Sequence, residues 1–67
     1  MTATDIRADW LADEIASFRE SAANYAALSL LGDGALAADH AKRAGIFAAR
    51  ADEAQGDLDD LIAQVQA

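Results

Sequence analysis

Several features that usually stabilise very small proteins are missing from this chain. It contains no cysteine, so neither a disulfide nor a thiolate metal site can hold it together. His40 is the single histidine, which leaves few ligands for a structural metal ion. A chain of 67 residues forms one domain at most and buries only a small fraction of its surface. Association with other chains is the remaining common means of stabilisation.

Proline is also absent, and aromatic residues make up only 6% of the chain. Alanine dominates the apolar residues, which reach 54% of the sequence. Alanine is the best helix former because its side chain loses no rotamer freedom when the helix forms. Few β-branched residues are present to favour strands. The composition therefore predicts an all-α protein.

Basic residues are scarce, and the formal net charge is −7. Because contacts to phosphates require Lys and Arg, this charge argues against direct binding to nucleic acid or to an anionic membrane. No apolar run approaches the ~20 residues of a membrane span. The first residues lack the basic and apolar regions of a signal peptide. The default expectation is a soluble, cytoplasmic protein.

Apolar and small residues recur at steps of three and four on both sides of a glycine-rich turn. This spacing predicts a first helix over about 5–31, capped by Thr4, and a second helix over about 35–65. Residues 32–34 form the turn, and Gly32 is expected to take the left-handed conformation that ends many helices. The two stripes are Leu11, Ile15, Phe18, Ala22, Tyr25 and Ser29, and Ala37, His40, Ala44, Phe47, Ala51, Ala54, Leu58, Leu61 and Val65.

So short a turn forces the helices to lie antiparallel, as a coiled-coil-like hairpin with an alanine-rich seam over residues 1–67. The register predicts that Phe18 and Phe47 are near one another and largely buried. His40 is expected to be buried with a hydrogen bond to Tyr25. Gly45 is interpreted as a point of close helix contact. An alternative fold has three helices, with a break near Gly56.

One seam cannot cover every apolar residue of such a hairpin. Four leucines near the turn point in several directions, and Ile46 stands on an otherwise charged face. Ile6, Trp10 and Ile62 are expected to cluster at the opposite, open end. Either a partner covers this surface, or a third short helix or a curled terminus does, and a partner is the favoured interpretation. The predicted interaction surface consists of Leu28, Leu30, Leu31, Leu36 and Ile46.

The charge is unevenly distributed along the chain. Residues 1–20 carry −3, residues 50–67 carry −4 and residues 21–49 carry none, so the hairpin concentrates its whole net charge at the open end. The acids have two interpretations: a solvated face that aids solubility, or a surface that meets a basic partner. The predicted acidic surface consists of Asp52, Glu53, Asp57, Asp59 and Asp60.

No pattern in the chain indicates catalysis. A di-metal helical site needs a Glu followed three residues later by a His, and this spacing does not occur. No Ser or Thr has a recognisable activating base, and the turn is too short for a phosphate-binding loop and lacks its Lys. We expect no enzymatic activity, no metal or other cofactor, and no small-molecule substrate.

The remaining hypotheses are two modes of protein binding. The first is an interaction or assembly module, a small helical subunit of a homo-oligomer or of a larger complex. The second is a small acidic inhibitor or nucleic-acid mimic that binds a basic groove on a target protein. Binding in the first case should tolerate salt, whereas in the second it should weaken as salt rises.

Overall fold

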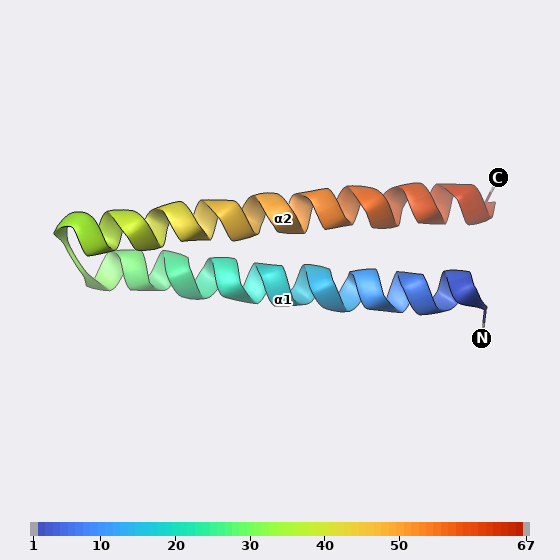
Figure 1. The fold of residues 1–67 in the computed structure, drawn as a ribbon, viewed down its shortest axis with the longest axis horizontal. Helices are drawn as coiled ribbons and strands as arrows, with labels where there is room; N and C mark the ends of the chain where they lie inside the picture. Colours follow the sequence, from blue (N-terminus) through green and yellow to red (C-terminus); the bar gives the residue numbers. More distant parts are fainter. Residues whose placement is uncertain (1, 67) are drawn as a thin grey trace.

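The computed structural model describes residues 2–66 as two helices, α1 (Ala3–Leu31) and α2 (Gly34–Gln66). Figure 1 shows the helices side by side and antiparallel, joined by a tight turn at one end. The start of α1 and the end of α2 lie together at the other end, here called the open end. The predicted helical hairpin is confirmed, and the break between its helices lies at the predicted glycine-rich turn.

The N-terminal cap of α1 is Thr2, so the prediction of Thr4 is wrong. The Thr2 hydroxyl accepts a hydrogen bond from the Asp5 backbone N–H at 3.2 Å, and the Asp5 carboxylate accepts one from the Thr2 backbone N–H at 3.1 Å. Thr4 would have Arg7 in the reciprocal position, and a guanidinium has no acceptor to offer. Hydrogen bonds from the Thr2 backbone and then from its side chain lower the pKa of Asp5.

The left-handed residue of the turn is Gly34, not Gly32 as predicted. Gly34 has a φ of 66°, whereas Gly32 is extended, with φ −111° and ψ −176°. The chain therefore leaves α1 in an extended conformation and reverses two residues later, where α2 begins. Residues other than glycine pay a steric cost at such a φ, so Gly34 is the glycine that the turn requires.

The other two glycines do not interrupt the fold. α2 continues through Gly56, so the three-helix alternative is wrong. A glycine in a helix costs about 1 kcal/mol relative to alanine, and the seam contacts of Ala54 and Leu58 on either side maintain the helix despite that cost. Gly45 is exposed, and a Cβ added there would meet nothing within 4 Å. The interpretation of Gly45 as a close-contact position is therefore also wrong.

The seam buries large residues of α1 against small residues of α2. Its most enclosed side chains are Leu11, Ile15, Ala51 and Ala54, with exposed fractions of 2–6%. The ring centroids of Phe18 and Phe47 lie 6.2 Å apart, as the register predicts. Both rings are only half-buried, however, so the expectation of large burial is wrong. Two helices form a single contact line, and no third element among residues 2–66 closes its edges.

The hairpin is a long, flat body with much of its surface exposed. Its radius of gyration is 15.3 Å, whereas a compact domain of this length would have about 11 Å. Its accessible surface is 4746 Å², against about 4000 Å² for a typical monomer of 7.0 kDa. With dimensions of 49 × 18 × 11 Å, the hairpin presents two broad sides, one on each face of the plane that contains the helices.

Candidate interaction surface

The two broad sides carry different residues. The first, here called the Trp10 side, includes Trp10 and Glu14 of α1 and Arg50 of α2, which line one hollow together. The second, here called the Arg19 side, is marked by a hydrogen bond of 3.2 Å from the Arg19 guanidinium to the Gln55 side-chain oxygen. Residues three and four positions apart lie on the same face of a helix. Most other positions can therefore be assigned to one broad side by their spacing from the residues that define it.

The four leucines near the turn are all exposed, as predicted. Their exposed fractions are 43% for Leu28, 86% for Leu30, 84% for Leu31 and 64% for Leu36. Helical spacing places Leu28, Leu31 and Leu36 on the Trp10 side and Leu30 on the Arg19 side. We call them the turn-end leucines. The structure brings all four to one end of the hairpin but divides them between its two sides.

Ile46 lies apart from this end, in a hollow of about 310 Å³ on the Trp10 side. The isoleucine is 42% exposed and is bordered by Asp39, Lys42, Arg43 and Arg50. The Arg43 guanidinium lies 5.9 Å from the ring centre of Tyr25, and that of Arg50 lies 5.6 Å from Phe47. These two arginines cover one edge of the aromatic seam. The predicted interaction surface is therefore two separate patches.

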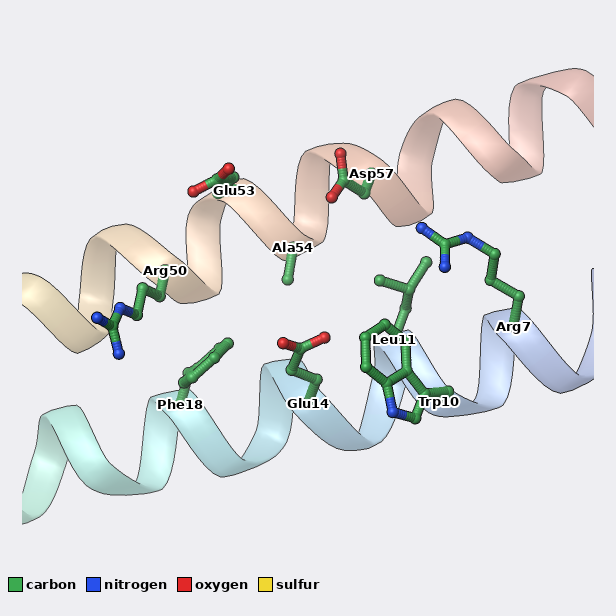
Figure 2. A pocket seen from close by; sticks show the side chains of 9 residues that line it. All are labelled: Arg7, Trp10, Leu11, Glu14, Phe18, Arg50, Glu53, Ala54 and Asp57. Atoms are coloured by element: carbon green, nitrogen blue, oxygen red, sulfur yellow. The ribbon is translucent and has the colours of Figure 1, made fainter.

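A larger hollow of about 410 Å³ opens toward the open end of the Trp10 side. Figure 2 shows its side chains rising from both helices, with Leu11 and Ala54 between them. Trp10 is 56% exposed, and the Arg7 guanidinium lies 5.8 Å from its ring centre. The hollow is therefore lined both by apolar side chains and by side chains of positive and negative charge.

The expected cluster of Ile6, Trp10 and Ile62 does not form. All three are exposed, but Ile62 belongs to a hollow of about 190 Å³ that Trp10 and Ile6 do not line. Ile6 and Ile62 are nearly level along the hairpin but project onto different faces, and Trp10 lies about one helical turn farther from the open end. Val65, which was assigned to the seam, lines the same hollow as Ile62 and is 63% exposed.

All five predicted acidic residues are exposed. Within residues 2–66 none of them forms a salt bridge, because the one ion pair found there joins Asp39 to Arg43 at 2.9 Å. Hydrogen bonds to Asp39 and then to Tyr25 raise the pKa of Arg43. Two bases lie near these acids: Arg50 lines a hollow with Glu53 and Asp57, and Arg7 shares a hollow with Asp57 and Asp60. The last turn of α2 contains no base.

His40 stacks on Tyr25 instead of forming the predicted hydrogen bond with it. The two ring centroids are 5.8 Å apart with an interplanar angle of 29°. The Nδ1 atom of His40 is buried and has no hydrogen-bond partner in the described part of the chain. Tyr25 also stacks on Phe47 at 5.6 Å, so His40 ends a row of aromatic rings in the seam.

Two further kinds of feature are not found among residues 2–66, a metal-ligand cluster and a membrane-spanning helix. No group of three His, Cys, Asp or Glu residues within 2–66 is placed to hold a metal ion. Neither helix, over the residues that the structure describes, is long and apolar enough to cross a membrane.

Sequence reasoning missed the division into two sides and, with it, a second regular row of residues along α1. The signal was present in the sequence as a further set of three- and four-residue steps that begins at Trp10.

Comparison with known proteins identified no relative of this chain. The chain matches no protein-family model, and it has no significant similarity to a curated protein or to a solved structure.

Proposed function

We propose that this chain is a non-enzymatic interaction and assembly module that associates through the turn-end leucines. The observation that most directly supports the proposal is the exposure of these four leucines. Between 43% and 86% of each residue's surface is exposed to solvent, although transfer of apolar side chains out of water is favourable. The turn half of the hairpin carries no net charge, so little electrostatic repulsion opposes its association with another surface.

Small size gives association a physical advantage. Among residues 2–66 only four apolar side chains are buried, and two of these are alanines. Burial of a leucine side chain contributes about 1.5–3 kcal/mol, so covering the turn-end leucines would add substantially to so small a core. A partner therefore stabilises the fold while it buries the exposed surface.

The proposal is tested with the double variant Leu30→Glu, Leu36→Glu. It places one charge on each broad side at the turn end and therefore disrupts docking from either side. Size-exclusion chromatography with light scattering measures self-association, and a pull-down with the tagged chain measures binding of another protein. The parent should associate at both low and high salt, and the double variant should lose that association.

A matched control adds the same two charges elsewhere. Ala49 and Ala63 are exposed on α2, at positions that point away from α1, and Ala49→Glu with Ala63→Glu should leave association unchanged. A parent that is folded, monomeric and without a captured protein would contradict the proposal. So would a double variant that still associates as well as the parent.

A second candidate is an acidic inhibitor or nucleic-acid mimic that binds a basic groove. Glu53, Asp57 and Asp60 favour it, because steps of four and three align these exposed carboxylates along one face without a salt bridge. Such a row resembles a row of phosphates. Binding to a basic partner should then weaken as salt rises and fail in a variant with Glu53→Gln, Asp57→Asn and Asp60→Asn. Binding unaffected by both changes would exclude this candidate.

A further inference from the structure

A second row of residues runs along α1 with the three- and four-residue spacing of the seam. Glu14 is its one charged member between Trp10 and Leu31, and it is half-buried. Such spacing keeps a row on one helix face, and Trp10 and Glu14 place it on the Trp10 side. The uncharged members are Trp10, Ser17, Ser21, Asn24, Leu28 and Leu31.

The row is nearly symmetric about its middle. Large apolar side chains stand at both ends, Ser17, Ser21 and Asn24 lie in the middle, and the one departure from symmetry is the charged Glu14 next to Trp10. Trp10 precedes Leu28 by about 27 Å along the helix, at a rise of ~1.5 Å per residue. Two copies of α1 that run in opposite directions would place Trp10 of each copy level with Leu28 and Leu31 of the other. Both ends of the row would be covered at once.

The middle of the row permits close approach. Ser17 of one copy would lie level with Asn24 of the other, and Ser21 would lie near the two-fold axis. Their polar groups can form hydrogen bonds across the contact, and their small size allows the two helix backbones to come together. A long charged residue in these positions would prevent this approach.

Charge selects the direction of the second copy. The net charge of −7 is concentrated at the open end, so copies aligned in parallel would bring two acidic ends together. Antiparallel copies place these ends at opposite extremes of the pair. Their separation then exceeds the screening length of about 8 Å at physiological salt.

The size of the surface is sufficient for a dimer. A broad side of 49 by 18 Å has a projected area of about 880 Å², comparable to the ~800 Å² per partner of a stable interface. The Trp10 side also carries more large apolar residues than the Arg19 side. On the latter, α1 offers Leu30 and otherwise mostly alanines, namely Ala12, Ala16, Ala23 and Ala26.

We propose that a second copy of this chain occupies the Trp10 side, with α1 antiparallel to α1 of the other copy and four helices in the assembled pair. This inference rests on the proposed function and names its partner. The contact between the two α1 helices covers Trp10, Leu28 and Leu31, and it leaves Leu30 at the surface.

Neighbouring leucines provide a matched test of the side. Leu30 and Leu31 are 86% and 84% exposed, and as consecutive residues they project about 100° apart, Leu30 toward the Arg19 side and Leu31 toward the Trp10 side. Leu31→Glu should weaken dimerisation at least about tenfold in light scattering, whereas Leu30→Glu should leave the mass near twice 7.0 kDa. Trp10 is the only tryptophan, so its fluorescence should shift to shorter wavelength as the parent dimerises. Equal effects of the two substitutions would overturn the assignment to this side.

Cysteine cross-linking tests the direction, because the native chain contains no cysteine. A disulfide requires Cα atoms within about 7 Å. Under mild oxidation Ser21→Cys should cross-link with itself, and Ser17→Cys should cross-link with Asn24→Cys better than either does alone. Ala23→Cys, on the Arg19 side, is the control that should stay reduced. Efficient self-linking of both Ser17→Cys and Asn24→Cys would indicate a parallel pair and overturn the proposal.

The outcomes separate this inference from the proposed function. A dimer that cross-links through Ala23→Cys would overturn the assigned side and leave an assembly module. A parent that stays monomeric at about 100 µM would exclude the second copy as partner. The proposed function would then depend on whether the double variant at Leu30 and Leu36 loses binding of a different protein.

Discussion

Phe18 and Phe47 face each other across the middle of the seam, with ring centroids 6.2 Å apart and both rings half-buried. Toward the open end, Leu11 is only 2% exposed. The seam is therefore tightest between the aromatic pair and the open end, not at the pair itself. The buried residues of that stretch are Leu11 and Ile15 of α1 and Ala51 and Ala54 of α2, so large side chains of one helix are enclosed with small side chains of the other.

This difference predicts the order of two core substitutions. Leu11→Ala should destabilise the hairpin by about 3 kcal/mol, within the range for a fully enclosed leucine. Phe18→Ala should cost about 2 kcal/mol, below the range for an enclosed phenylalanine, because part of the ring already contacts water. Urea denaturation followed by circular dichroism at one fixed protein concentration measures both. A larger loss for Phe18→Ala would show that the aromatic pair is more enclosed than described.

The hairpin could be predicted from the sequence because its determinants are local. Steps of three and four specify each helix, and a turn of so few residues leaves only an antiparallel partner. The cap was misplaced because Thr2 and Thr4 are both good caps by type. The choice depends on which residue follows three positions later, Asp5 or Arg7.

The side of the hairpin on which each exposed residue lies was harder to predict, because it depends on the direction in which the side chain projects around the axis of its helix. The exposure of the turn-end leucines follows from their number, since one seam cannot cover them all. Their division between two sides does not follow from composition or charge. Likewise, Ile62 and Trp10 project onto different faces and line different hollows, which a pairing of residue numbers does not describe.

The glycines give a second prediction, with opposite signs at two positions. Gly56→Ala should stabilise the hairpin by about 1 kcal/mol, because alanine favours the helix and the added Cβ meets nothing within 4 Å. Gly34→Ala should destabilise it by about 1–2 kcal/mol, because Gly34 has a φ of 66°. Thermal and urea unfolding of both variants provide the measurement. If Gly34→Ala is neutral, the turn does not require the left-handed conformation.

The Asp5 cap gives a third prediction, on pH. Hydrogen bonds from Thr2 lower the pKa of Asp5 below its ordinary value of 3.8. A lowered pKa in the folded state means that the contribution to stability is present above the unfolded pKa and is lost as pH falls through the folded one. The parent should therefore be more stable than Asp5→Asn at pH 7, and this difference should shrink as the pH falls below 3.8 and through the lowered pKa of Asp5.

The difference between the two proteins is the informative quantity, because lowering the pH also removes repulsion among the other acids. Helix content and melting temperature between pH 7 and pH 2.5 should be compared at constant ionic strength. Asp13→Asn is a suitable control, since this acid is exposed near the same end of α1 and makes no hydrogen bond with the cap. A difference between parent and Asp5→Asn that stays constant with pH would contradict the role of the carboxylate.

The last prediction concerns His40, whose Nδ1 atom is buried without a hydrogen-bond partner in the described residues. A buried polar atom without a partner costs about 1–3 kcal/mol, and an apolar replacement of similar size removes that cost. His40→Leu should therefore stabilise the hairpin by about 1 kcal/mol, after allowance for the lost stacking on Tyr25 at 5.8 Å. His40→Gln, which keeps a polar group in the seam, should not stabilise it. Urea unfolding at one pH and one fixed protein concentration compares the three proteins. If His40→Leu is less stable than the parent, the ring stacking outweighs the unpaired atom, or the Nδ1 atom has a partner in solution.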